Sequence, residues 1–156
     1  MNRKHGFTLI ELLTVVLILG ILTAIALPQY RKSIQRAEAA DALINLKTMF
    51  DAAKRFYSYH SEWPSTFKGL DVEFLDITDN GEVGEFKYTL NASTRTASAC
   101  RLLGSDTSKS FCLTAYYKDS NGNRDIYTCK DNSGGKYQSL CDSMCPTTSS
   151  GECTIE

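Results

Sequence analysis

Residues 3–30 of this chain read RKHGFTLIELLTVVLILGILTAIALPQY. Two basic residues at the start of this stretch precede an apolar run from Phe7 to Leu27, and the run holds one charged residue, Glu11. A helix from Phe7 to Pro28 would be about 33 Å long, which is close to the thickness of the hydrocarbon core of a bilayer. The run therefore predicts one membrane-spanning helix.

Glu11 is the anomaly of this run, because an ionised carboxylate inside a membrane helix costs at least about 3 kcal/mol. One interpretation is that Glu11 reaches the nearby headgroups, since it lies one turn from the start of the run. The other is that the carboxylate has a specific partner. The residues alone leave both interpretations open.

A secretory signal peptide is the obvious alternative for this segment. Such a signal has an apolar region of about 7 to 15 residues followed by a cleavage site of small residues. The run here is longer and ends at Leu27-Pro28. If the chain is cut, a site after Gly6 fits better, because it removes the basic leader and keeps the apolar helix, with Phe7 as the new amino terminus.

The segment from Gly6 to Leu13, with Pro28 and Tyr30 at the far end, resembles the class III signal of type IV pilins and of the pseudopilins of type II secretion. The resemblance implies that a prepilin peptidase cuts between Gly6 and Phe7 and methylates the amino group of Phe7. It also implies a homopolymer that is built by an assembly platform in the inner membrane, with the apolar helices as the filament core.

The resemblance gives Glu11 an assembly role. As the fifth residue of the processed chain, its carboxylate can neutralise the amino-terminal charge of Phe7 of a neighbouring subunit. The resemblance also implies that the helix between Gly20 and Pro28 can lose helical order in a filament. Gly costs about 1 kcal/mol and Pro about 3 kcal/mol in a helix interior, but membrane helices tolerate both, so a mild kink without function is the alternative.

Beyond Pro28, residues 29–59 contain neither Gly nor Pro. Apolar residues recur there at spacings of three and four, which marks one face of a helix. We therefore predict one long helix, membranous in its first half, amphipathic in its second, and ended before Pro64. The residues of the apolar face are Ala39, Leu43, Leu46, Phe50, Ala53 and Tyr57.

Strand patterns follow the helix at residues 86–90, 97–103, 111–117 and 125–129. Asn121-Gly122 between the last two segments predicts a hairpin. The expected fold class is α+β, with the long helix packed on a small antiparallel sheet of about four strands and a disulfide-stapled carboxy-terminal loop.

Oxygen-bearing side chains alternate between the last two predicted strands, as they do in calcium loops. The loop lacks the distal glutamate of an EF-hand and has its glycine at the wrong position, so a turn explains it adequately. We expect no cofactor, and a calcium site remains the alternative for Asp119, Asn121, Asn123 and Asp125.

All six cysteines lie in the carboxy-terminal third, at Cys100, Cys112, Cys129, Cys141, Cys145 and Cys153. No pair has the two-residue spacing of a zinc knuckle, so disulfides in an oxidising compartment are expected. Sequence leaves fifteen connectivities open. The resemblance implies a bridge from the last strand to the carboxy-terminal loop, which Cys129 with Cys141 fits. Pairing in sequence order adds Cys100 with Cys112 and Cys145 with Cys153.

Enzymatic and nucleic-acid functions find no support in the sequence. It has no glycine-rich phosphate loop and no nucleophile elbow, and His60 is the one histidine beyond the leader. A formal net charge of −1 provides no basic surface overall. We expect a non-enzymatic protein, and the sequence carries no strong nucleic-acid signal, although a local basic stripe stays open.

The predicted organisation is a leader at 1–6, a membrane and filament-core helix at 7–28, and a periplasmic or extracellular domain at 29–156. The amino terminus stays cytoplasmic in the inner membrane, and the assembled subunit reaches the cell surface. The predicted function is that of a type IV pilus subunit, with adhesion, twitching motility or DNA uptake as outputs. A type II secretion pseudopilin and a membrane-tethered binding module that does not polymerise are the alternatives.

Overall fold

The structure is a computed structural model that describes residues 8–71, 77, 81–101, 111–117, 125–145, 147–149 and 152–155, of which 147–149, 152 and 153 are described by their backbone. The chain divides into two compact units, Met1–Glu38 and Ala39–Glu156. The first unit contains the amino-terminal part of the long helix α1, and the second contains the remainder of α1 with all the strands.

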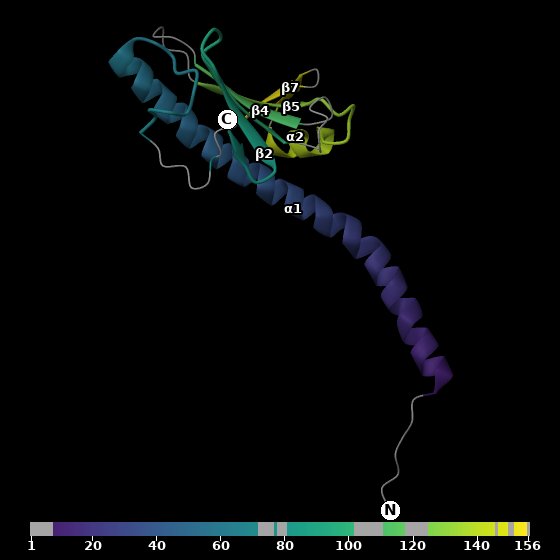
Figure 1. The fold of residues 1–156 in the computed structure, drawn as a ribbon. Helices are drawn as coiled ribbons and strands as arrows, with labels where there is room; N and C mark the ends of the chain where they lie inside the picture. Colours follow the sequence, from purple (N-terminus) through teal and green to yellow (C-terminus); the bar gives the residue numbers. More distant parts are fainter. Residues whose placement is uncertain are drawn as a thin grey trace, which may run out of the picture. The chain divides into compact units, whose positions relative to one another are not determined.

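Helix α1 runs from Leu9 to His60, with Pro28 inside it (Figure 1). The helix ends where Ser61 takes a left-handed backbone conformation with φ 57°, and its N–H donates to the carbonyl oxygen of Tyr57 at 2.8 Å. The prediction of one long helix that stops before Pro64 is confirmed.

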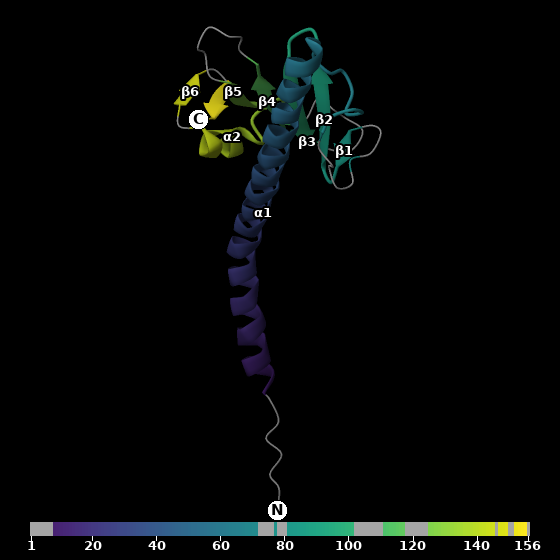
Figure 2. The same ribbon diagram turned by 90° about the vertical axis from the view of Figure 1, so that its left-hand side faces the viewer.

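The second unit contains an antiparallel sheet with the strand order β1-β2-β3-β4-β5-β7-β6 (Figure 2). A short helix α2, Gln138–Met144, follows β5 and contacts β5 and β7. The strands are β1 Glu82–Val83, β2 Phe86–Asn91, β3 Thr96–Arg101, β4 Phe111–Tyr116, β5 Ile126–Asp131, β6 Thr147–Ser149 and β7 Glu152–Ile155.

The expected number of about four strands was too low, since the described residues form a sheet of seven strands. The four predicted strands are the long ones, β2 to β5. The missed strands β1, β6 and β7 have two, three and four residues. They are too short to show an alternation of polar and apolar residues in the sequence. The carboxy-terminal region predicted as a loop therefore contains α2 and two strands.

The core of the second unit lies between α1 and one face of the sheet. The predicted apolar face of the helix is confirmed, since Ala39, Leu46, Phe50 and Ala53 are fully buried and the other two members pack against them in part. The sequence interpretation did not assign Trp63 to the core, although it is only 7% exposed. The Trp63 ring centroid lies 5.7 Å from that of Phe50 and 5.4 Å from that of Tyr117.

Candidate functional site

The amino-terminal part of α1 exposes its apolar side chains on every side. Between Leu9 and Leu27 the large aliphatic residues are 51% to 81% exposed. By length and composition α1 is able to cross a membrane. Continuous apolar surface of this size is stable only against lipid or against other apolar helices.

Glu11 and Thr8 form a reciprocal cap at the start of α1. The Thr8 backbone N–H and hydroxyl both donate to Glu11 Oε2 at 2.8 Å, and the Glu11 backbone N–H donates to Thr8 Oγ1 at 3.3 Å. This is the capping-box arrangement, which satisfies helix amides that otherwise have no intrahelical partner. The spacing Thr-x-x-Glu is visible in the sequence, but the sequence interpretation did not use it.

The cap gives Glu11 a partner within its own chain. The carboxylate of a single subunit is therefore not an isolated charge, because two donors from Thr8 meet one of its oxygens. Gly6 and Phe7 lie outside the described residues. Cleavage between them, methylation of Phe7 and its pairing with Glu11 stay predictions.

The remaining polar groups of the apolar segment are satisfied within the helix. The Thr14 hydroxyl donates to the carbonyl of Glu11 at 2.9 Å, and the Thr23 hydroxyl lies 2.8 Å from the carbonyl of Leu19. A Cβ added at Gly20 would meet no atom within 4 Å, so packing within this unit does not require glycine there. Helix α1 is continuous through Gly20 and Pro28, and loss of helical order in a filament stays a prediction.

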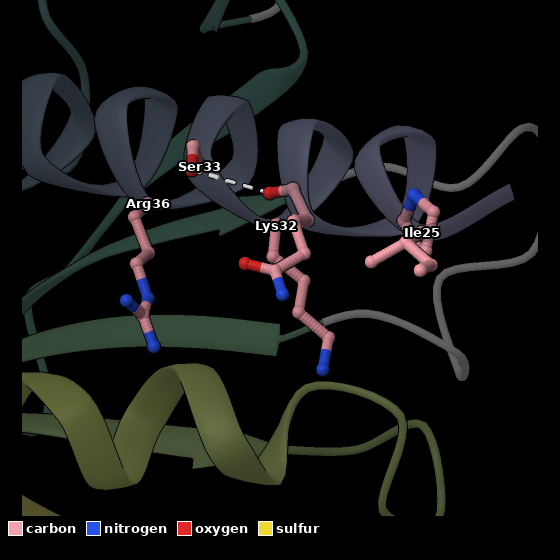
Figure 3. A pocket seen from close by; sticks show the side chains of 6 residues that line it. Ile25, Lys32, Ser33 and Arg36 are labelled. Atoms are coloured by element: carbon pink, nitrogen blue, oxygen red, sulfur yellow. Dashed lines mark hydrogen bonds between the residues drawn. The ribbon is translucent and has the colours of Figure 1, made fainter. Parts of the chain in front are cut away.

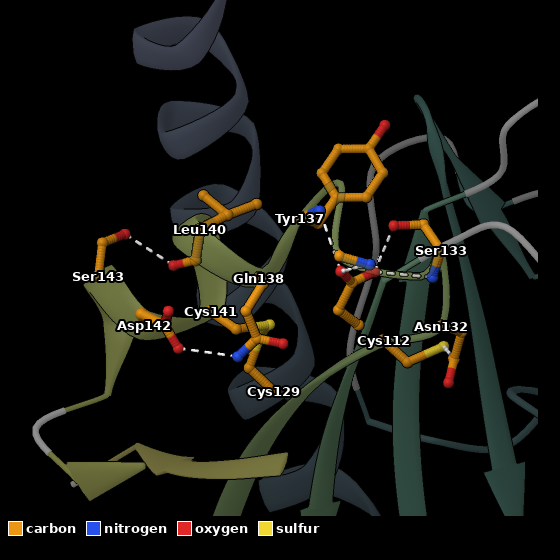
Figure 4. Close-up of a disulfide and its surroundings, with 12 residues drawn as sticks. Cys112, Cys129, Asn132, Ser133, Tyr137, Gln138, Leu140, Cys141, Asp142 and Ser143 are labelled. Carbon is orange, nitrogen blue, oxygen red and sulfur yellow. Dashed lines mark hydrogen bonds between the residues drawn. A yellow bond between two sulfur atoms is a disulfide. The ribbon is translucent and has the colours of Figure 1, made fainter. Parts of the chain in front are cut away.

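Two of the expected disulfide pairs are present, one that the resemblance implied and one from pairing in sequence order. Cys100–Cys112 joins directly opposed positions of β3 and β4. Cys129–Cys141 joins β5 to α2 (Figure 4). Cys129 and Cys141 are buried, whereas the other pair is half-buried. Cys145 is also disulfide-bonded.

The Cys129–Cys141 loop is organised around the carboxylate of Asp131. The backbone N–H groups of Ser133, Gly135 and Tyr137 donate to it at 2.7, 3.0 and 3.1 Å, and the Ser133 hydroxyl donates to the same group. Partial burial raises the pKa of Asp131. The hydrogen bonds from Ser133, Tyr137 and Gly135 lower this pKa by a larger amount, so it lies below its usual value. The Asp-Asn-Ser-Gly-Gly run at 131–135 is typical of such a turn, but the sequence interpretation did not use it.

We expect Asp131→Asn to lower the free energy of unfolding by about 1 to 2 kcal/mol, because an amide group offers one acceptor oxygen where the carboxylate offers two. The contribution of Asp131 to stability is present above the unfolded pKa and is lost as the pH falls through the lower folded pKa. Urea unfolding of the full chain at pH 7 and below pH 4 measures both effects. A difference between wild type and variant that grows on acidification would contradict this assignment.

Of the candidate calcium ligands, Asp119, Asn121 and Asn123 lie outside the described residues. Asp125 accepts a hydrogen bond from Lys54 Nζ, which also lies 3.2 Å from Asp51. Burial lowers the pKa of Lys54, but its hydrogen bonds with these carboxylates outweigh this and raise it overall. Among the described residues no group of three or more His, Cys, Asp or Glu side chains could hold a metal ion.

Comparison with known proteins gives one family match at the amino-terminal end and several relatives that match part of the chain. Residues 1–27 match the family described as the prokaryotic N-terminal methylation motif. A fimbrial protein of Neisseria meningitidis serogroup B is 44% identical over 91 residues, which cover 51% of this chain and 53% of that protein. A type IV major pilin protein of Neisseria gonorrhoeae is 42% identical over 102 residues, covering 58% and 54% respectively.

A type IV major pilin protein of Myxococcus xanthus is 50% identical over 56 residues, which cover 36% of this chain and 26% of that protein. The chain thus spans between about a quarter and about half of the length of these three relatives. The methylation motif, the exposed apolar helix within it and these relatives make the chain similar to type IV pilins over part of its length.

Proposed function

We propose that this chain is the structural subunit of a type IV pilus filament. The observation that carries the proposal is a helix that begins with a methylation motif and exposes its aliphatic side chains on every side from Leu9 to Leu27. A helix of this kind can be covered by lipid before assembly and by the same helix of other subunits afterwards. Pilin relatives support the filament as the final state.

Processing prepares the helix for this role. Prepilin peptidase removes residues 1–6 and methylates the amino group of Phe7, which makes residues 7–28 the filament core and leaves 29–156 as the exposed domain. Removal of Arg3 and Lys4 is necessary because both charges would otherwise enter the apolar core.

Assembly then exchanges lipid for protein around the helix. The subunit is held in the inner membrane with a cytoplasmic amino terminus, the assembly platform adds it to the filament, and the filament carries it to the cell surface. Glu11 neutralises the Phe7 amino group of a neighbouring subunit, and the helix between Gly20 and Pro28 loses order under load. The role is structural rather than enzymatic.

The carboxy-terminal disulfides support the route to an oxidising compartment. Two of the bridges are Cys100–Cys112 and Cys129–Cys141, and Cys145 is bonded as well. We assign Cys153 as the partner of Cys145. A peptide that links the two after proteolysis without reduction is the test of this pair.

The proposal is tested on filaments sheared from cells that produce the chain. Mass spectrometry of this material should yield an amino-terminal peptide that starts with methylated Phe7, and an antibody to the chain should label the filaments along their length. Labelling at the ends alone would mean a minor subunit. Chain that remains uncut in the membrane would favour a tethered binding module, and cleaved chain without surface filaments would favour a secretion pseudopilin.

A further inference from the structure

Three basic residues, Arg31, Lys32 and Arg36, follow the apolar run immediately, and we call them the basic collar. All three are exposed, and no acidic residue occurs between Glu11 and Glu38. Among the residues that the structure describes, the ion pairs involve other side chains. The collar is therefore a concentrated positive charge at the end of the apolar segment that lies opposite the leader.

Part of the collar borders an open groove of about 500 Å³ along α1. Figure 3 shows Lys32 and Arg36 extending from the helix in the same direction. Ile25 and Pro28 line the apolar end of the groove, whereas Lys32, Ser33 and Arg36 line its polar end together with Gln29. Lys32 and Arg36 are one helical turn apart, so both can approach the same anion.

The position of the collar is costly for membrane insertion. Basic residues are favoured on the cytoplasmic flank of a membrane helix. With the amino terminus in the cytoplasm, as proposed above, the three collar residues lie on the opposite flank. Cleavage after Gly6 would increase the difference in basic residues between the two flanks, because Arg3 and Lys4 leave with the leader. A favourable interaction on the outer flank has to offset this cost.

Phosphate is the chemistry that fits the polar end of the groove. Arg binds phosphate through two parallel hydrogen bonds and Lys binds it as a compact charge. Basic residues beside a membrane helix attract anionic lipids in the same way. The apolar end of the groove suits an acyl chain, and Tyr30 precedes the collar at the position where aromatic residues mark a membrane interface.

We propose that the basic collar binds the phosphate group of an anionic phospholipid in the leaflet opposite the leader. This proposal rests on the membrane stage of the proposed function. The bound headgroup fixes the depth of the helix before assembly, and transfer into a filament has to break the contact.

The test uses the full-length chain in nanodiscs that contain equal amounts of phosphatidylglycerol and phosphatidylcholine. Lipids that stay bound on release into detergent are counted by native mass spectrometry. We expect the unmodified chain to retain phosphatidylglycerol preferentially. Lys32→Gln combined with Arg36→Gln should lower the ratio of the two lipids about 25-fold, since each basic residue near an anionic surface accounts for about five-fold. Millimolar inorganic phosphate should not displace the lipid.

Lys47→Gln is the matched control, because Lys47 is an exposed lysine of the same helix outside the collar. It should leave the lipid ratio unchanged. Equal retention of both lipids by the unmodified chain, an equal loss in the control, or displacement by inorganic phosphate would each overturn the proposal. If filaments form normally but the chain shows no lipid preference, the collar site is refuted and the pilus assignment is not. If the chain shows the lipid preference but forms no filaments, the pilus assignment is refuted and the collar site is not.

Discussion

Glu11→Ala is expected to abolish surface filaments while membrane insertion and leader cleavage continue. The charge on the Phe7 amino group of the neighbouring subunit would then be buried in the filament core without a counter-charge. Breaking a buried ion pair by removing one partner costs about 3 kcal/mol or more, which is a factor above about 100 in subunit addition. Immunoblots of sheared filaments and of membranes from the same cells measure how much of the chain is assembled and how much remains in the membrane.

The capping box supplies a second explanation for such a loss, and two further variants separate the explanations. Glu11→Gln removes the charge but keeps an oxygen that can accept from Thr8. Thr8→Val keeps the charge but removes the hydroxyl that bonds Glu11, which costs about 1 kcal/mol as the loss of a helix cap.

If charge pairing is the role of Glu11, the glutamine variant fails to assemble and the valine variant retains most of its filaments. If instead the glutamine variant assembles and the valine variant does not, the role of Glu11 is to cap the helix. Normal filament yield from Glu11→Ala would contradict both explanations. The cysteine bridges should stay intact in every variant, since they lie in the other unit of the chain.

Replacement of both Cys129 and Cys141 by alanine should lower the free energy of unfolding by about 3 kcal/mol in the chain-entropy model. The two residues are 12 positions apart, and the bridge fixes α2 against β5. The loss should exceed the entropy estimate, because both sulfur atoms are buried and their removal leaves a cavity. Denaturant unfolding of the full chain in detergent is the measurement.

The other bridge is a matched control. Cys100 and Cys112 are also 12 positions apart, so their removal changes loop entropy by the same amount. These cysteines are half-buried on strands that are already hydrogen-bonded to each other, so no comparable cavity forms. We expect the smaller loss for this pair. Equal losses would show that burial contributes nothing, and a loss below about 1 kcal/mol for the buried pair would contradict the entropy estimate.

Long periodic segments are the part of the fold that sequence predicted well. The apolar spacing from Ala39 to Tyr57 identified the face of α1 that packs on the sheet, because a helix repeats its contacts every turn. The strands β2 to β5 are long enough for alternation and turn residues to identify them. Of the two disulfide pairs predicted correctly, Cys129–Cys141 came from the family resemblance and Cys100–Cys112 from pairing in sequence order.

Features that depend on tertiary contacts were not predicted from the sequence. Trp63 reaches the core because residues beyond the end of α1 fold back against Phe50 and Tyr117, and no periodic pattern records this. Asp131 opens a turn-forming run at 131–135, but this run does not show that the carboxylate also accepts from the more distant amide of Tyr137. The pairing of Glu11 with Phe7 would be a contact between subunits, so one chain cannot display it.

The brevity of the outermost strands has a consequence for the subunit before it assembles. Among the described strands, the sheet ends in β1, with two residues, on one side and in β6, with three, on the other. A sheet edge is a template for unwanted pairing with other chains, and short edge strands provide few free backbone groups for it. In the proposed membrane stage, neighbouring subunits would therefore have few free edge groups through which to join their sheets, and we expect them to associate through their helices.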